Sequence, residues 1–574
     1  MSTNSPGELG FGGTEEAPAG LPDPLILARM ANEFFTAVSG AQPAAPESSE
    51  PAPAFSFPEV VRPRYPEPEE EAAALSTFLK AGQAPAVPTP PMPTFPGGLD
   101  STALPAFSFL EEARPLFSYP PAAAAPVPAL KLSSDFFDAQ TIRRDFPLLR
   151  EQVNGRPLVW LDNAATTQKP QSVIDRLSYF YEYENSNVHR AAHEMAARAT
   201  DAYESAREKV RRFLNASTVR EIIFVRGATE GINLVAQSWG RRNVQKDDEI
   251  VITWLEHHAN IVPWQALCSE KGARLRVAPV DDRGQVILEE YEKLLGPRTR
   301  LVSIAQVSNA LGTVTPLPEM IEAAHRYGAR VLVDGAQAVS HMRVDVQALS
   351  CDFFVLSGHK MFAPTGIGVL YGRSDVLDAM PPWQGGGNMI QDVTFERTVY
   401  QPPPARFEAG TGNIADAVGL GAAIDYLDRV GMANISRYEH ELLLYGTAAL
   451  EQVPGLHIIG TAPEKAGVLS FVLDGVRTEE IGDLLNREGI AVRAGHHCAQ
   501  PIHRRFGIES TVRASLALYN TCEDIDALAA ALLRIQTARP GHGFRLDNPA
   551  WPRATEAAAA PDAGFGLNVI EPRP

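Results

Sequence analysis

The hydrophobic pattern of the chain changes near residue 133. Beyond that point, and up to about residue 400, short apolar runs alternate with segments whose apolar residues recur at helical spacing. The candidate strands lie at residues 222–225, 250–253, 274–277, 301–305, 331–333 and 353–356. Apolar runs without alternation are typical of strands that are buried on both faces. The pattern therefore predicts an α/β fold with a large, mostly parallel sheet that helices cover on both faces.

The segments on either side of this region follow other patterns. A first helix is predicted at residues 134–146, because Pro147 stops it. After about residue 415 the order is helix, strand 468–473, helix 479–488, strand 491–493 and a last helix from Asp524, which predicts a smaller α+β domain. We therefore expect four regions: an N-terminal extension (1–134), a large domain (135–410), a small C-terminal domain (411–540) and an irregular tail (541–574).

The N-terminal extension has the composition of a disordered segment. Residues 1–134 contain 24 of the 47 prolines, and 15 acidic residues against 6 basic ones. Proline interrupts helices and central strands, and the few apolar residues cannot offset the entropy of ordering the chain. Within this background, residues 25–35 place Leu27, Met30 and Phe34 at helical spacing, and residues 69–79 predict a second short helix.

A five-residue motif, Pro-Ala-Phe-Ser-Phe, occurs twice in the extension, at residues 53–57 and 105–109. Repeated aromatic motifs in a disordered tether are typical of multivalent docking peptides. The alternative is that any Ala/Pro-rich sequence produces short repeats by chance. We favour docking, because aromatic residues are otherwise scarce in disordered segments.

Charge and cysteine usage argue against several classes of protein. Half of the net charge of −18 lies in residues 1–134, so the rest of the chain is only mildly acidic and does not attract nucleic acid or an anionic membrane. No apolar run reaches the roughly 20 residues of a transmembrane helix, and the N-terminus does not resemble a secretory signal. The four cysteines lack a paired spacing, so we expect no disulfide framework, no metal site and a cytoplasmic location.

The candidate chemistry lies where two of the apolar runs end. Asp334 follows one run, and Ser357, His359 and Lys360 follow the next. A lysine at the mouth of a buried strand can form a Schiff base, and a carboxylate at the neighbouring strand can hold a pyridine nitrogen protonated. The plain alternatives are a turn carboxylate and an exposed lysine. The combination favours a pyridoxal phosphate site in the large domain, since ligands bind beyond the carboxyl ends of parallel strands.

Two further motifs follow strands of the same predicted sheet. Residues 226–231 open a helix, and their free amides and the Thr229 hydroxyl suit a phosphate group. Residues 256–260 place His257 over the same crevice. A histidine at a strand end is by default a hydrogen-bonded structural residue. Beside Asp334 and Lys360, we expect it to stack on the cofactor ring.

Nine motifs occur in the order found in one known family. They lie at residues 162–167, 187–190, 229–233, 256–260, 334–337, 357–360, 385–387, 493–498 and 513–515. Over about residues 135–535 the chain resembles the SufS-type, or group II, cysteine desulfurases of the class V aminotransferase family. The resemblance implies a pyridoxal phosphate-dependent transferase of fold type I that converts L-cysteine to L-alanine. It also implies a homodimer whose active sites lie at the subunit interface.

The resemblance assigns a role to each matching residue. Lys360 would hold the cofactor covalently and take the substrate proton, Asp334 would pair with the ring nitrogen, Gln337 would reach the phenolic oxygen and His257 would stack on the ring. The phosphate would be bound by residues from both subunits: Ala228 through its amide, Thr229, Ser357, His359 and Thr411 of the partner subunit. Ala228 and Gly412 depart from the family pattern, where Thr and Pro are usual.

The resemblance also implies a substrate site and a nucleophile. Asn309 and Arg513 would hold the substrate carboxylate, with His189 and Arg493 nearby. Cys498 would take up the substrate sulfur as a persulfide. His496, His497 and Arg493 could favour its thiolate, although a pair of histidines is also compatible with a solvated loop. The other cysteines are expected to be inert small hydrophobes, namely Cys268, Cys351 and Cys522.

The extension resembles the leader of desulfurases that are packaged inside family 2 encapsulin shells, which implies a shell protein as partner of residues 1–134. The sulfur acceptor stays open between a SufE- or SufU-like protein, a free thiol and elemental sulfur. Two other functions are also open: a selenocysteine lyase or other class V enzyme, and a structural sulfur-storage cargo. Cys498 favours the desulfurase, because selenide leaves with less help from a nucleophile.

Overall fold

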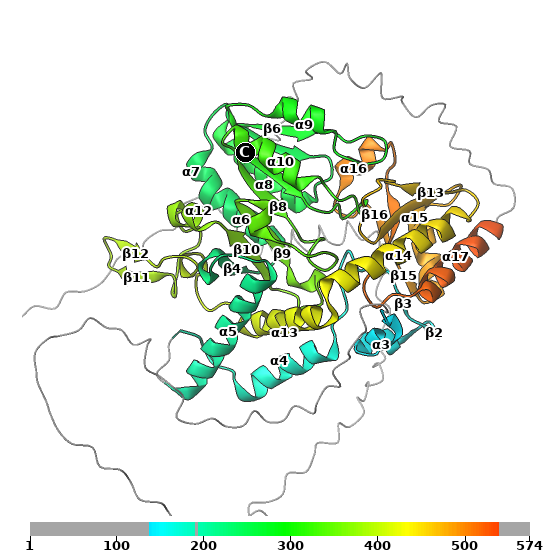
Figure 1. Ribbon diagram of the computed structural model, residues 1–574, viewed down its shortest axis with the longest axis horizontal. Helices are drawn as coiled ribbons and strands as arrows, with labels where there is room; N and C mark the ends of the chain where they lie inside the picture. The colour runs from blue at the N-terminus through cyan, green and yellow to red at the C-terminus, as the bar shows by residue number, and fades with distance from the viewer. Residues whose placement is uncertain (1–136, 190–192, 539–574) are drawn as a thin grey trace, which may run out of the picture. The chain divides into compact units, whose positions relative to one another are not determined.

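The computed structural model describes residues 137–189 and 193–538, which contain a seven-stranded sheet (Figure 1). The predictions for the extension and for the tail lie outside the described residues. In spatial order the strands are β4 (Ile222–Val225), β10 (Gly368–Gly372), β9 (Phe353–Ser357), β8 (Arg330–Asp334), β7 (Thr299–Ala305), β5 (Glu249–Thr253) and β6 (Arg274–Ala278). The neighbours from β9 to β6 are parallel, and β10 is antiparallel to both of its neighbours. The predicted large, mostly parallel sheet is confirmed.

Strand β10 is the one strand of this sheet that the sequence pattern misses. It has glycine at both ends, and glycine is depleted in strands. A Cβ atom at Gly368 would lie only 2.5 Å from the Cα atom of Gly227. The glycine therefore lets the start of helix α6 (Ala228–Val235) lie directly against the sheet.

Alternate residues of the strands enter two apolar layers, one on each face of the sheet. In β4, Ile222 and Phe224 belong to one cluster of buried side chains, and Ile223 and Val225 belong to the other. The first cluster is covered by α4 (Gln171–Tyr183), α5 (Glu194–Phe213), α10 (Leu317–Arg326) and α13 (Ile414–Val430). The second is covered by α6, α8 (Val262–Lys271) and α12 (Ser374–Ala379). This burial on both faces explains the apolar runs.

A smaller antiparallel sheet is built from the C-terminal part of the chain. Its strands in spatial order are β13 (Leu456–Ile459), β14 (Val468–Leu473), β17 (Thr511–Ser515) and β16 (Arg493–Gly495). Helices α14 (Met432–Glu451), α15 (Thr478–Arg487) and α17 (Cys522–Thr537) share a third buried cluster with it. The parallel pair β3 (Val159–Trp160) and β15 (Ile490–Ala491) joins an early segment of the chain to this region.

The first predicted helix is shorter than expected. Helix α3 (Ala139–Arg143) begins after Asp138, whose carboxylate accepts the N–H of Thr141 at 3.0 Å. Pro147 does not only stop a helix, since it also begins the 3₁₀ helix η1 (Pro147–Arg150). The fixed φ of proline suits a first helical position, which explains the difference. Within residues 137–189 and 193–538, no helix combines the length and hydropathy needed to cross a bilayer.

The remaining elements are short. The helices are η2 (Val219–Glu221), η3 (Ala236–Gly240), α7 (Arg241–Asn243), η4 (His258–Asn260), α9 (Leu288–Leu294), α11 (Val346–Leu349), η5 (Gly358–Lys360), η6 (Ala405–Phe407) and α16 (Gln500–Arg505). The strands are β1 (Gln152–Val153), β2 (Arg156–Pro157), β11 (Ile390–Val393) and β12 (Thr398–Tyr400). The hairpin of β11 and β12 projects from the body of the fold at the left of Figure 1.

Candidate active site

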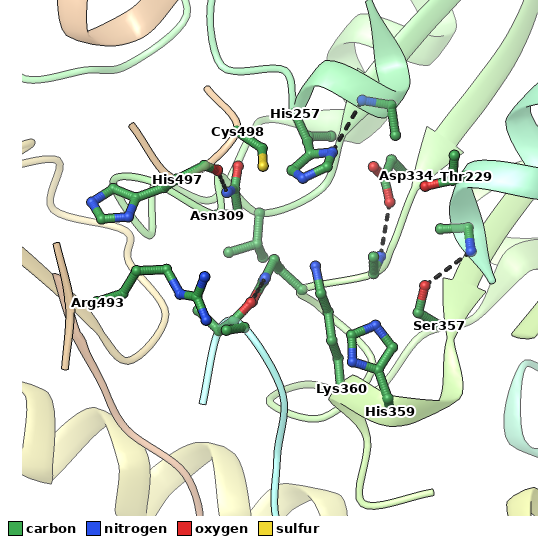
Figure 2. A pocket seen from close by; sticks show the side chains of 18 of the residues that line it. Thr229, His257, Asn309, Asp334, Ser357, His359, Lys360, Arg493, His497 and Cys498 are labelled. Carbon is green, nitrogen blue, oxygen red and sulfur yellow. Dashed lines mark hydrogen bonds between the residues drawn. The ribbon is translucent and has the colours of Figure 1, made fainter. Parts of the chain in front are cut away.

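A cavity of about 290 Å³ lies beyond the carboxyl ends of β5, β8 and β9. Its size is at the lower end of ligand pockets, which span about 300–1,000 Å³. Figure 2 shows the side chains of Lys360, His257 and Cys498 turned toward this common space. The cavity therefore joins the ends of the large sheet to a loop of the small one.

Lys360 lies in the turn η5, directly after strand β9. Removal from water lowers the pKa of Lys360 to about 8, and the nearby carboxylate of Asp334 acts in the opposite direction. Because the turn ends a strand that is fully buried, the side chain has a fixed starting point at the cavity wall. A substantial fraction of this amine is neutral near pH 8, as a nucleophile or base requires.

Asp334 is the last residue of the neighbouring strand β8 and lies on the same edge of the sheet. Its carboxylate accepts the N–H of Ala336 at 3.0 Å. Burial raises the pKa of Asp334 above its usual value, while the charge of Lys360 opposes this effect. A buried carboxylate of this kind is stabilised by a positive charge in the cavity, which a protonated pyridine ring would supply.

His257 follows strand β5, and its Nδ1 atom accepts the N–H of Ala259 at 3.0 Å. The ring proton therefore lies on Nε2. Burial, and after it the charge of Lys360, lower the pKa of His257 to about 3, so the imidazole is neutral. A neutral, half-buried aromatic ring at the cavity wall can lie against a flat cofactor.

The predicted phosphate-binding residues of this cavity lie at the start of α6, at the end of β9 and in η5. Ser357 Oγ accepts the N–H of Ala228 at 2.9 Å, so this amide already has a partner. Thr229 and His359 line the cavity beside them (Figure 2). Burial lowers the pKa of His359 to about 4, which leaves its imidazole neutral. The first-turn amides of α6 remain a suitable site for a phosphate group.

The residues predicted to bind the substrate carboxylate are hydrogen-bonded to one another and to the loop that carries Cys498. Arg513 donates to the backbone oxygen of Asn309 at 2.8 Å, and Asn309 donates to the backbone oxygen of His497 at 2.6 Å. Arg493 and Arg513 also share the carboxylate of Asp162, at 2.8 Å and 3.4 Å. Two buried atoms in this group have no hydrogen-bond partner, Asn309 Oδ1 and Arg513 Nε. An unsatisfied donor is expected where a ligand binds.

Cys498 is exposed and lies at the tip of a loop between β16 and α16. His497 and Cys498 both adopt positive φ angles, 50° and 54°. Two backbone contacts hold the loop from outside, because His258 donates its N–H to the Cys498 carbonyl at 2.8 Å and Asn309 binds the His497 carbonyl. Burial lowers the pKa of His497 to about 2, so its imidazole is neutral and does not act on the thiolate through a full charge.

Two predicted residues do not line this cavity. Thr411 and His189 instead line a second cavity of about 240 Å³ within the same chain. Thr411 lies 3.5 Å from the side chain of Asn187, and His189 pairs with Glu204 at 2.9 Å. The single chain therefore brings together the other residues predicted to bind cofactor or substrate but not these two.

Three residues important to the site received no role from the sequence. Glu256 is fully buried and accepts hydrogen bonds from Thr253, Asn260 and the Ala305 amide, and burial raises the pKa of Glu256 to about 7. Asp162 bridges the two arginines described above. Lys169 donates to the backbone oxygen of His359 at 3.2 Å and so holds the turn of Lys360. The partners of Asp162 and Lys169, and the Ala305 amide that binds Glu256, are distant in sequence, so only the fold reveals these contacts.

The other cysteines differ from one another. Cys268 and Cys351 are buried, and burial raises the pKa of Cys268 to about 11, as expected of inert thiols. Cys522 is exposed at the start of α17, so its predicted place as a small hydrophobe is wrong. Within the described ranges, no group of three or more His, Cys, Asp or Glu side chains is arranged to hold a metal ion.

Residues 159–528 match the model of the aminotransferase class-V family. A cysteine desulfurase of Synechococcus elongatus is 60% identical over 538 residues, which is 91% of this chain and 84% of that protein. A probable cysteine desulfurase of Mycobacterium leprae is 65% identical over 401 residues, 70% of this chain and 66% of that protein. The chain belongs to the cysteine desulfurases of the aminotransferase class-V family. Its cofactor is pyridoxal phosphate, and its substrate is L-cysteine.

Solved structures agree with this family. The cysteine desulfurase CsdA of Escherichia coli superposes with a TM-score of 0.66 at 40% identity, over 70% of this chain and all of that one. A cysteine desulfurase of Thermococcus onnurineus gives a TM-score of 0.67 at 36% identity, over 70% of this chain and 98% of that one. The fold is therefore fold type I of the pyridoxal phosphate enzymes.

The residues of the cavity fit the cofactor. An amine, a buried carboxylate and a neutral imidazole lie around one space, at Lys360, Asp334 and His257. The partly unsatisfied Arg513 and Asn309 line the same cavity as the nucleophile candidate, Cys498. A desulfurase needs such groups to hold the cofactor ring, to bind the substrate and to accept the substrate sulfur.

Proposed function

We propose that this enzyme is a SufS-type, or group II, desulfurase that leaves the substrate sulfur as a persulfide on Cys498. The observation that carries the proposal is that Cys498 and Lys360 line one cavity although they follow strands of two different sheets. The exposed thiol can meet a substrate inside the cavity and an acceptor outside it. A buried thiol could not serve both partners.

Several residues of the strand ends would hold the cofactor. Lys360 would bind it covalently, Asp334 would pair with its ring nitrogen, Gln337 would reach its phenolic oxygen and His257 would lie against its ring. Its phosphate would be held by Thr229, Ser357 and His359, and by the Ala228 amide once this amide exchanges its present partner, Ser357 Oγ, for the phosphate. When bound, pyridoxal phosphate takes up the electron pair that is left when the substrate α carbon loses its proton.

The protein groups then move protons and sulfur. Lys360, with a pKa near 8, takes the proton from the substrate α carbon. The Cys498 thiol attacks the substrate sulfur, so that a sulfur–sulfur bond forms and the carbon–sulfur bond of the substrate breaks. The carbon fragment gains hydrogen and becomes L-alanine, while the transferred sulfur is oxidised to the level of a persulfide. Atoms balance, since L-cysteine and one thiol give L-alanine and one persulfide.

Asn309 and Arg513 are proposed to hold the substrate carboxylate, with Arg493 nearby. Burial lowers the pKa of Arg513 to about 10, so it remains a cation at neutral pH. Its unsatisfied Nε atom can donate to a carboxylate without breaking an existing hydrogen bond. His189 would contribute only from a neighbouring subunit or after a movement, because it lines the other cavity.

Substitution of Cys498 tests the assignment of the nucleophile. Cys498→Ser should keep the cofactor absorbance and lose L-alanine formation from L-cysteine. Cys522→Ser is the matched control, since Cys522 is also exposed but does not line the cavity. Full activity of Cys498→Ser, or loss of activity in Cys522→Ser alone, would refute the proposal.

We also propose a homodimer in which Thr411 completes the phosphate site of the partner subunit. The support is that Thr411 is exposed and lies in a cavity apart from Lys360 of its own chain. Two variants with damaged sites, Lys360→Ala and Thr411→Asp, should therefore regain activity when their subunits are mixed. In a mixed dimer one site contains both native residues. No recovery after verified subunit exchange would contradict the shared site.

The extension is proposed to dock the enzyme inside an encapsulin shell. The support is the pair of Pro-Ala-Phe-Ser-Phe motifs and the apolar segment 25–35. The similarity to the Synechococcus elongatus protein covers 91% of this chain, so it must include part of residues 1–134. Coexpression of a reporter fused to residues 1–134 with a family 2 shell protein should yield loaded shells. A variant with all four phenylalanines of the motifs changed to serine should remain outside, and equal loading of both would reject docking.

The sulfur acceptor follows from the compartment that we propose. Inside a cytoplasmic shell, elemental sulfur or a free thiol would take sulfur from Cys498, whereas a free enzyme would use a SufE- or SufU-like protein.

Sulfide and selenide release measured with L-cysteine and L-selenocysteine would separate this function from that of a selenocysteine lyase. Dependence on Cys498 for sulfur but not for selenium is the expected result.

A further inference from the structure

The buried hydroxyl group of Thr511 forms hydrogen bonds on both sides of Cys498, to His497 before it and to His503 after it. Strand β16 enters the loop at Gly495, which lies opposite Thr511 in the pairing of β16 with β17. Beyond the loop, helix α16 turns back and brings His503 to the same point. Thr511 Oγ1 lies 2.8 Å from His497 Nε2 and 3.2 Å from His503 Nε2. All three side chains are buried, with exposures of 1%, 7% and 3% for Thr511, His497 and His503.

The direction of this hydrogen-bond chain follows from one backbone carbonyl. His503 Nδ1 lies 3.0 Å from the oxygen of Ala499, and a carbonyl oxygen can only accept, so Nδ1 carries the proton. A neutral His503 then has a free electron pair at Nε2, to which the Thr511 hydroxyl donates. The same hydroxyl oxygen accepts the N–H at Nε2 of His497. Burial lowers the pKa of both imidazoles, that of His497 to about 2, so both are neutral and the chain is intact at ordinary pH.

The loop needs such support because its backbone is strained. The left-handed conformation of His497 and Cys498 is unfavourable for residues other than glycine, and it persists only where the surroundings fix it. Asn309 and His258 fix the two carbonyl groups of these residues. The Thr511 chain fixes the side chain of His497, which Figure 2 shows turned away from Lys360. The residue before the thiol is thus held through its backbone and its ring.

We propose that Thr511 and His503 are positioning residues for Cys498, because they fix the ring of His497 and thereby the backbone that presents the thiol. The inference rests on the proposed role of Cys498 as the sulfur-accepting nucleophile. His497 lines the cavity, whereas Thr511 and His503 lie behind it and contact neither ligand nor thiol. Their effect should therefore appear only in the step that uses the thiol.

A matched pair of substitutions at Thr511 separates the hydroxyl from the shape of the side chain. Thr511→Val keeps the branched shape and removes the hydroxyl, while Thr511→Ser keeps the hydroxyl. In the holoenzyme, Thr511→Val should lower kcat for L-alanine formation from L-cysteine about tenfold, with KM and the cofactor absorbance unchanged. Thr511→Ser should stay within about twofold of the wild type.

A second readout distinguishes positioning from general damage. Exchange of the α hydrogen of L-alanine in heavy water uses Lys360 and the cofactor but not Cys498, and nuclear magnetic resonance follows it directly. This exchange should proceed at the wild-type rate in Thr511→Val and in His503→Leu, although both lose desulfuration. The double variant should be no slower than the slower single variant, because the three residues act as one chain.

The proposal fails if either variant retains the wild-type kcat, or if desulfuration and exchange fall together. Should Thr511→Val not bind cofactor, His503→Leu decides by the same two measurements. Cys498→Ser, measured in parallel, separates this proposal from the function on which it rests. An active Cys498→Ser refutes the nucleophile itself, whereas an inactive Cys498→Ser beside normal Thr511 and His503 variants refutes only the positioning role.

Discussion

The cavity has two walls that are built in different ways. The strand-end wall consists of Asp334, Lys360 and His257, which lie at or just beyond the ends of buried strands. The thiol loop, residues 496–499, connects a three-residue strand to a six-residue helix and contains two residues with left-handed backbone. The first wall is fixed by the core of the protein, and the second by a few hydrogen bonds to distant residues.

The difference matches the tasks of the two walls. Groups that hold a cofactor and move one proton need constant positions and removal from water, which the ends of a buried sheet provide. A thiol that takes up sulfur and passes it on must be reached from the cavity and from outside. Cys498 is exposed at the tip of its loop, so it can meet both partners. The sheet therefore supplies the chemistry, and the loop supplies the transfer.

Removing the amine from the strand-end wall should have the largest effect. Lys360→Ala should abolish the cofactor absorbance of the Schiff base and lower L-alanine formation about 10⁴-fold, because it removes both the covalent link and the base. Lys465 is a matched control, since burial likewise lowers the pKa of Lys465 to about 8 but it does not line the cavity. Normal activity of Lys360→Ala, or equal loss in Lys465→Ala, would remove the distinction between the walls.

Neutralising the carboxylate of the same wall should have the next largest effect. Asp334→Asn keeps the size of the side chain but removes the charge that would pair with the ring nitrogen, so kcat should fall about 10²-fold or more. The control is Asp352→Asn, because Asp352 is buried just before the opposite end of strand β9 and pairs with Arg330 at 2.7 Å. Steady-state kinetics should show a much smaller change in kcat for this control. Similar losses would indicate damage to the sheet.

A substitution in the buried layer behind the strand-end wall should lower the stability of the folded protein. Three groups donate hydrogen bonds to the buried carboxylate of Glu256, at distances of 2.6–2.9 Å. Glu256→Gln places an N–H group against these donors, so the free energy of unfolding should fall by about 1–3 kcal/mol. Glu290→Gln, on the exposed helix α9, should change it by less than about 0.5 kcal/mol. Denaturant unfolding of the holoenzyme gives both values, and an unaltered Glu256→Gln protein would show that this support is dispensable.

The smallest predicted effect concerns the pH dependence of cofactor binding. In the cofactor-free protein the pKa of Lys360 is lowered to about 8, and only its neutral form attacks the cofactor aldehyde. The rate of cofactor capture should rise about tenfold per pH unit below pH 7 and level off above about pH 8. Stopped-flow absorbance measures this rate. A rate that keeps rising toward about pH 10 would mean that Lys360 behaves as an ordinary exposed lysine.

The two walls also differ in how far the sequence predicts them. The apolar runs before Asp334 and Lys360 are local signals. The strands, the reactive residues that follow them and a common cavity could therefore be predicted. The contacts of the thiol loop could not, because Asn309 and His497 are 188 positions apart and Thr511 acts through two histidines. Strand β10 was hidden by its terminal glycines, and the need for Gly368 arises from the close approach of Gly227 and the Leu356 carbonyl, which only the fold brings about.

The decisive measurement is the position of the transferred sulfur in the protein. The holoenzyme is incubated with L-cysteine without reductant, its thiols are blocked, and its peptides are weighed by mass spectrometry. We expect one added sulfur atom on the peptide that contains Cys498, and none on the peptide of Cys522, which is also exposed. Formation of L-alanine with no sulfur on Cys498, or with sulfur on Cys522 instead, would contradict the division of work between the sheet and the loop.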